Sequence, residues 1–232
     1  MSASLAQTIG LLQLASPALP IGGYSYSTGL EWGIDSGAVQ DSETARAWIA
    51  DALALSLASF EGPLMCAAMR AARAVPDPDA RAALAALNAQ ALAARETAEL
   101  RLESEQMGHS LGRWLEAVCP DETHAGPLAE TPPQPALPVA WALAALRLGL
   151  SESEALLGLF WTFAENQAMV LMKALPMGQI AAQRLLRALG PDLEAAVERA
   201  RTLPPEAWSS AAPGLAIASA HHETQYSRLF RS

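Results

Sequence analysis

Helix-forming residues dominate this sequence, and they restrict what the chain can fold into. Alanine is very abundant, and it favours helices because it loses no side-chain entropy when a helix forms. β-branched and aromatic residues, which favour strands, are scarce; aromatic residues make up only 6% of the chain. The sequence contains no strand pattern and no internal repeat. It therefore predicts an all-α fold.

Proline and capping residues mark where the expected helices begin and end. Asp41 is suited to an N-cap, and Ser151 with Glu154 forms a capping box. Pro63 is expected to start a helix of its own. The stretch 79–118 is longer than an ordinary globular helix, so we expect an interruption within it. The full pattern predicts helices over residues 5–15, 27–36, 42–59, 63–75, 79–118, 139–148, 152–175, 178–189, 192–202 and 214–225.

Residues 120–138 differ from the rest of the chain in composition. Prolines, Gly126 and several acidic residues gather there, which is typical of a loop. The helical stretches on either side look alike. We therefore expect one domain over residues 1–232, with an exposed Pro-rich loop inside it.

Residues 16–27 form a second stretch that cannot be a regular helix. Pro17 and Pro20 block helix formation, and Gly22 with Gly23 permits backbone angles closed to other residues. The stretch is nevertheless apolar, so we expect an ordered loop rather than a flexible linker. The side chains expected to be buried are Leu19, Ile21, Tyr24 and Tyr26.

Charge and hydropathy exclude several classes of protein. The net charge is −9 and the pI about 4.9, which disfavours nucleic acid as a partner because that binding depends on Lys and Arg. No uncharged apolar run reaches membrane-spanning length, and residues 1–10 lack the pattern of a signal peptide. Cys66 and Cys119 are expected to be buried thiols of a cytoplasmic protein. Only 17% of the residues are charged, which predicts an apolar surface suited to partner proteins.

No catalytic or cofactor motif is found in the sequence. A nucleophile elbow, a phosphate-binding glycine loop and paired catalytic carboxylates are all missing. The histidines are not spaced as metal ligands, so we expect no metal site and no cofactor. The four are His109, His124, His221 and His222.

Two polar stretches permit more than one interpretation. Residues 165–167 (Glu-Asn-Gln) interrupt an apolar helix, which fits hydrogen bonding within the fold as well as a subunit interface or channel. Residues 95–105 carry six charges, which fits a solvated helix face with i,i+4 pairs as well as a docking surface.

The end of the sequence is unusually apolar and aromatic. Chain ends are commonly frayed and polar, yet Tyr226, Leu229 and Phe230 lie within the last seven residues. The segment 223–232 is therefore expected to dock, either on its own domain or on a partner. The residues alone leave both alternatives open.

Two long stretches of the sequence are highly specific: residues 11–31 (LLQLASPALPIGGYSYSTGLE) and residues 222–232 (HETQYSRLFRS). The first resembles the opening signature of the urease accessory protein UreF family, and the second carries the most characteristic likeness to that family. Weaker similarities lie at 95–101, 106–108, 137–139 and 175–179. The resemblance covers nearly the whole chain.

The resemblance implies an all-α bundle of about ten helices that forms a homodimer and has no enzymatic activity. Proteins of this kind join the accessory protein UreD (also called UreH) and the GTPase UreG to apo-urease for nickel insertion. They recruit UreG and modulate its GTP hydrolysis. On the family's motifs, Tyr24 and Arg228 are expected to contribute to the UreG-binding surface. The full set of expected partner-binding residues is Tyr24, Ser25, Tyr26, Glu31, Glu223, Tyr226, Arg228, Leu229 and Phe230.

A function of a different class is the alternative. An all-helical enzyme could bind a small apolar ligand in its core, with Glu165, Asn166 and Gln167 as its catalytic groups. Co-purification with urease accessory proteins, against retention of a small molecule, separates the two functions.

Overall fold

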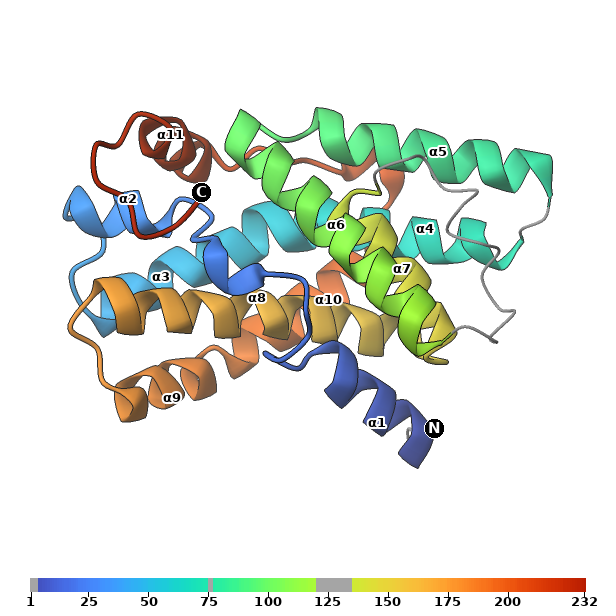
Figure 1. Ribbon diagram of the computed structural model, residues 1–232, viewed down its shortest axis with the longest axis horizontal. Coiled ribbons are helices and arrows are strands. Elements are labelled where there is room, and N and C mark those ends of the chain that lie inside the picture. Colours follow the sequence, from blue (N-terminus) through green and yellow to red (C-terminus); the bar gives the residue numbers. More distant parts are fainter. Residues whose placement is uncertain (1–3, 75–76, 120–134) are drawn as a thin grey trace.

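Every regular element in the part of the chain that the structure describes is a helix, which confirms the all-α expectation. The computed structural model describes residues 4–74, 77–119 and 135–232 (Figure 1). The α-helices are α1 (Leu5–Leu14), α2 (Leu30–Asp35), α3 (Ser42–Ala52), α4 (Gly62–Arg73), α5 (Pro78–Ala93), α6 (Ala98–Val118), α7 (Leu137–Arg147), α8 (Glu152–Ala174), α9 (Gln179–Ala188), α10 (Gly190–Thr202) and α11 (Pro213–His222). Shorter elements are η1 (Gly23–Ser25), the π-helix η2 (Leu53–Glu61) and η4 (Pro205–Ala207).

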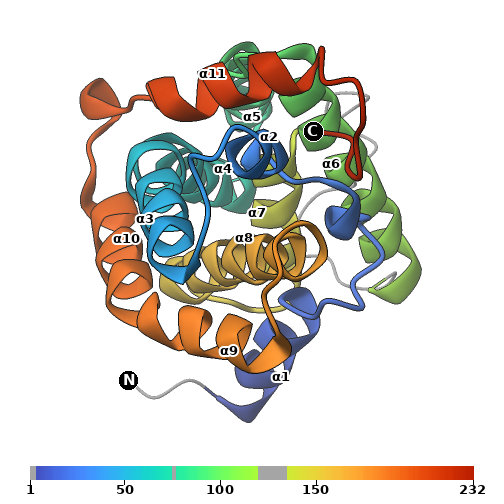
Figure 2. The same ribbon diagram turned by 90° about the vertical axis from the view of Figure 1, so that its left-hand side faces the viewer.

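Helix α8 lies inside the bundle, and the other helices pack around it. It contacts α1, α2, α3, α4, α7, α9 and α10, and Figure 2 looks nearly along its axis. One hydrophobic cluster fills the interior, with Trp141 and Phe160 fully buried in it. The Gly108 position lets α6 approach the start of α7, because a Cβ there would lie 1.9 Å from the Pro135 carbonyl oxygen. The result is a single all-α bundle.

Local capping follows the sequence closely. The Asp41 carboxylate accepts the backbone N–H groups of Glu43 and Thr44, and Ser151 with Glu154 forms the expected capping box. The expected interruption of the stretch 79–118 is also confirmed. It falls between α5 and α6, where Thr97 caps the new helix. These signals are local, so they do not depend on the tertiary fold.

The expected helix start at Pro63 is wrong. The helix is continuous from Ser42 to Arg73, and Pro63 lies within it. Proline has no N–H for the carbonyl four residues earlier, which belongs to Ser59. The Ser209 N–H donates to that carbonyl at 3.0 Å instead. The π-helix η2 and the hydrogen bond from Ser209 therefore accommodate Pro63 within the helix.

Three other boundaries shift for physical reasons. The helix expected from residue 27 begins only at Leu30, because Thr28 and Gly29 have φ angles of 54° and 79°. Gly190 was expected to separate two helices, but it is the first residue of α10, which follows α9 directly. The last helix ends at His222, three residues early.

The loop before α2 is ordered as expected, with one correction. Leu19, Ile21 and Tyr26 are buried, whereas Tyr24 is 66% exposed, so its expected burial is wrong. Of the expected Pro-rich loop, residues 120–134 lie outside the described part of the chain. Residues 137 and 138 belong to the first turn of α7.

Two long helices are apolar enough to cross a membrane by length and composition alone. They are Ser42–Arg73 and Glu152–Ala174, and 78% and 56% of their most apolar windows are buried inside the bundle. Core helices of soluble proteins pass the same test. Cys66 and Cys119 are both buried, as expected, and burial raises the pKa of the Cys66 thiol to about 12.

Candidate functional site

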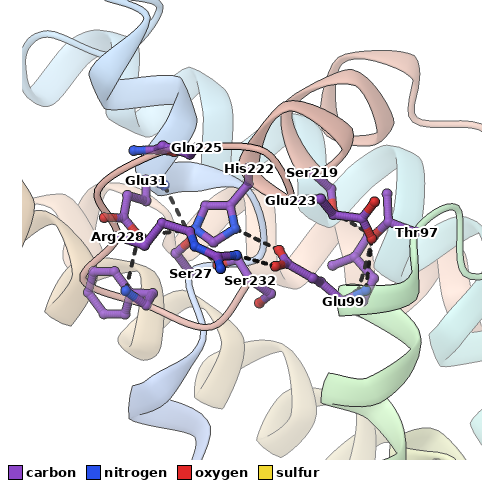
Figure 3. Close-up of polar contacts among 12 residues, drawn as sticks. Ser27, Glu31, Thr97, Glu99, Ser219, His222, Glu223, Gln225, Arg228 and Ser232 are labelled. Carbon is purple, nitrogen blue, oxygen red and sulfur yellow. Dashed lines mark hydrogen bonds and ion pairs between the residues drawn. The ribbon is translucent and has the colours of Figure 1, made fainter.

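The segment 223–232, which we call the C-terminal tail, folds back over the bundle after α11. Figure 1 shows it returning to α2, and Figure 3 shows its polar contacts with α2 and α6. The loop 16–29 approaches the tail from the other end of the chain, since the Ser25 carbonyl accepts the Arg231 N–H at 2.8 Å. The two longest family-like motifs therefore meet in one place.

Glu31 is the anchor of the tail. Its side chain is 7% exposed, and its two carboxylate oxygens accept the backbone N–H groups of Leu229 at 2.6 Å and Phe230 at 3.0 Å. A buried carboxylate needs such donors, because burial without them is costly. Thr28 and Gly29 adopt left-handed backbone angles immediately before α2. They thereby set the direction of the helix that carries Glu31.

His222 links the two helices beneath the tail. Its ring is completely buried, with Nε2 3.1 Å from Glu31 Oε2 and Nδ1 2.7 Å from Glu99 Oε2. Arg228 donates to the other oxygen of Glu99 at 2.5 Å (Figure 3). Glu223 adds a contact by accepting the Glu99 backbone N–H at 3.2 Å. Titratable side chains from α2, α6, α11 and the tail thus converge on one cluster.

The end of the tail is held by hydroxyl groups. The Ser27 N–H donates to the Ser232 carbonyl at 2.9 Å, and the Ser27 hydroxyl donates to the same oxygen. The Ser232 hydroxyl donates to Glu103 at 2.6 Å, and Thr28 donates to the other oxygen of Glu103 at 3.1 Å. Burial raises the pKa of Glu103.

The polar stretch 165–167 on α8 supports the same region from below. Asn166 donates to the Tyr26 carbonyl at 2.8 Å and Gln167 to the Ser27 carbonyl at 3.1 Å. Burial raises the pKa of Glu165, the third member. Of the two interpretations of this stretch, hydrogen bonding within the fold is therefore confirmed for Asn166 and Gln167.

Lys173 fixes the apolar part of the tail. Its ammonium group donates to the Leu229 carbonyl at 3.2 Å and lies 4.4 Å from the centroid of the Phe230 ring. Such a contact adds a cation–π attraction to the burial of the ring. The tail thus docks on its own domain, which was one of the two alternatives for it.

Of the nine expected partner-binding residues, Ser25 is half-buried and Glu223 is exposed, and the other seven fall into two groups. Tyr26, Glu31 and Phe230 are buried and hold the loop, α2 and the tail together. The other four present side-chain surface to solvent: Tyr24 and Leu229 are 66% and 54% exposed, Tyr226 is fully exposed, and the Arg228 side chain is 39% exposed.

Glu99 and His222 were not among the expected site residues, yet both are central to the cluster. The sequence places Glu99 in the charged stretch 95–105 and His222 at the start of the closing motif. The charged stretch 95–105 combines both expected environments, a solvated helix face and a docking surface. Arg101 and Glu105 form an exposed i,i+4 pair at 3.0 Å, whereas Glu99 and Glu103 contact the tail.

A partly enclosed cavity lies between α6, α8 and η2. Its wall includes Glu61 and Arg95, which form an ion pair at 2.9 Å, together with Asn166. Its volume of about 80 Å³ is enough for a few water molecules. Pockets for small apolar ligands usually occupy roughly 300 to 1,000 Å³. This cavity is therefore too small for such a ligand, whereas a more open hollow of about 390 Å³ between α1 and α8, lined by Glu165, falls within that range.

Comparison with known proteins identifies the family. The UreF family model matches residues 39–190. The urease accessory protein UreF of Ectopseudomonas mendocina (strain ymp) is 53% identical over 96% of this chain and 97% of its own. The chain belongs to the UreF family. UreF proteins of Azoarcus sp. (strain BH72) and Dechloromonas aromatica (strain RCB) are 50% and 45% identical over 97% of this chain, and 95% and 98% of their own.

The relatives are named as accessory proteins of urease, and that name states no reaction. Within the described residues, no three side chains of His, Cys, Asp or Glu converge as they would around a metal ion. His124 lies outside those residues. The carboxylates of Glu31 and Glu99 instead have hydrogen-bond and ion-pair partners from the same chain.

Proposed function

We propose that this UreF-family chain is a cytoplasmic scaffold that joins UreD and the GTPase UreG to apo-urease for nickel insertion. In this role it recruits UreG and modulates its GTP hydrolysis, and catalyses no reaction itself. The observation that carries the proposal is the tail: its docking leaves Tyr24, Tyr226, Arg228 and Leu229 at the surface over a buried, hydrogen-bonded base. A rigid base lowers the entropic cost of binding a partner.

The chemistry of this surface suits a protein partner. Tyrosine and arginine are the residues most enriched at interface hot spots, and both are present here. The Arg228 side chain stays 39% exposed while its Nη1 pairs with Glu99. A guanidinium group has five N–H donors, so it can also donate to a carboxylate or a backbone carbonyl on the GTPase. The partner-binding set from the sequence is therefore retained, with its buried members as the support.

We also propose that the chain forms a homodimer, and that α1 contributes to the interface. Leu5, Ile9 and Leu12 follow i,i+4 and i,i+3 spacing and are 84%, 65% and 67% exposed. The opposite face of α1 packs on α7 and α8. An exposed stripe of large apolar side chains is favourable only if a second surface covers it. The domain 1–232 would then be one unit of the dimer.

Co-purification tests the proposal directly. The full chain should bind UreD, and the resulting complex should capture UreG in the presence of GTP and nickel. A parallel experiment uses the purified chain alone. It should neither hydrolyse GTP nor retain a small molecule. Failure to bind either accessory protein, or a tightly held apolar compound in the purified chain, would contradict the proposed function.

A further inference from the structure

The imidazole of His222 is held between two carboxylates, and this arrangement determines its protonation. Glu31 already accepts a backbone N–H at each oxygen, from Leu229 and Phe230. Glu99 accepts from Arg228 at one oxygen and faces the ring with the other. Both side chains accept N–H groups as ionised carboxylates do, and in that form they have no proton to give the ring.

A ring with acceptors on both sides must donate from both nitrogens. Nε2 lies 3.1 Å from Glu31 and Nδ1 lies 2.7 Å from Glu99. A neutral imidazole has only one N–H, so its lone pair would face a carboxylate oxygen across one of these distances. The imidazolium donates to both. With Arg228, it also balances the two carboxylates, and loss of one proton leaves an uncompensated negative charge in a buried place.

We propose that the C-terminal tail is a proton-dependent clasp, which His222 holds closed as the imidazolium and which opens when His222 loses that proton. The released proton passes to solvent. Because closure requires one proton, the opening constant should rise with pH by at most tenfold per pH unit.

Each element packed around the His222 ring contributes titratable or charged groups. They are Glu31 from α2, Glu99 from α6 and Arg228 from the tail, while His221 and Glu223 flank it on its own segment. His221 is different from its neighbour, since it stacks on Trp32 at 4.8 Å between ring centroids. Glu103 titrates separately at the far end of the tail, against Ser232.

The clasp carries a consequence for recruitment that rests on the proposed function. Arg228 and Leu229 belong to the tail, so an open clasp would disorganise the surface offered to UreG. The opening itself is a property of the chain alone. Its measurement therefore stands whether or not the GTPase binds.

Two measurements on the full-length protein across a pH series of about 5.5 to 9.5, the range in which histidine charge changes, test the clasp. Nitrogen-15 spectra of the histidine rings report which nitrogens of His222 carry protons. Hydrogen exchange of residues 223–232, divided by the rate of the same free peptide, reports tail opening. We expect both ring nitrogens to be protonated while the tail is protected, and opening to rise in step with loss of the imidazolium. A neutral ring beneath a protected tail, or opening that does not change with pH, would overturn the clasp.

Variants identify the group responsible. His222→Gln should leave the tail open across the series, because a neutral amide cannot replace the positive charge of the imidazolium between the two carboxylates. His221→Gln is the matched control and should keep the wild-type profile. If His221→Gln abolishes the pH dependence, or if His222→Gln keeps it, the assignment to His222 is wrong. If His222→Gln does not fold, the wild-type ring spectra and exchange decide the question.

Discussion

The two ends of the chain are attached to the bundle by different physical means. Helix α1 lies on α7 and α8 through apolar contacts, and it exposes a second apolar face with Leu5, Ile9 and Leu12. The C-terminal tail is held by charged groups and hydrogen bonds centred on Glu31 and His222. Apolar contacts respond little to pH and salt, whereas charged contacts respond to both. One end thus suits a lasting interface, and the other suits a contact that can be switched.

Substitution within the exposed stripe of α1 should have the largest effect. Ile9→Arg would bury a charge without a partner in the proposed dimer interface, so dimer affinity should fall at least about a hundredfold. Light scattering should then give the monomer mass at tens of micromolar concentration. Gln183→Arg, on the exposed face of α9, is the matched control and should stay dimeric. A dimeric Ile9→Arg protein would remove α1 from the interface.

Loss of the tail anchor should have the next largest effect. Glu31→Ala removes the acceptor of two backbone N–H groups and of His222, and unsatisfied buried donors cost about 1 to 3 kcal/mol each. We expect the free energy of unfolding to fall by about 2 to 3 kcal/mol, partly offset by tail release. Urea titration measures the fall, and hydrogen exchange of residues 223–232 measures the release. Glu116→Ala, at an exposed position of α6, should change neither; a protected tail in Glu31→Ala would contradict the anchor role.

Salt separates the two ends by a smaller effect. Raising NaCl to about 1 M shortens the screening length to roughly 3 Å and weakens the partly exposed Arg228–Glu99 pair. Tail exchange should increase a few-fold, while the dimer dissociation constant should stay the same or decrease. Hydrogen exchange measures tail opening and light scattering measures the dimer dissociation constant, and both use the same set of samples. Equal salt sensitivity at the two ends would mean that they are not attached by different forces.

The contrast between local and distant contacts explains what the sequence predicts. Caps such as Asp41 and Ser151 act within three residues, so they can be read directly from the sequence. Pro63 was misassigned because the donor for the Ser59 carbonyl comes from Ser209, far along the chain.

The candidate site was predicted in part, for the same reason. Tyr24 and Arg228 were found through the family motifs, and both present surface to solvent. The role of Glu31 as an anchor depends on Leu229, which lies 198 positions away. The contact of Glu99 with His222 spans 123 positions. No local pattern encodes such pairs, and only the folded chain brings them together.

The most direct test of the account is the affinity of UreG for the complex of this chain with UreD, measured for Arg228→Ala. Arg228 is half-exposed and its pair with Glu99 contributes about 1 kcal/mol or less, so the variant should fold, dimerise and bind UreD normally. Its affinity for UreG should fall roughly thirtyfold, which corresponds to about 2 kcal/mol at an interface hot spot, and urease should stay inactive. Arg113→Ala, at an exposed position of α6, should bind UreG as the wild type does. Normal UreG affinity and normal urease activation by Arg228→Ala would contradict the central claim that the tail forms the recruitment surface.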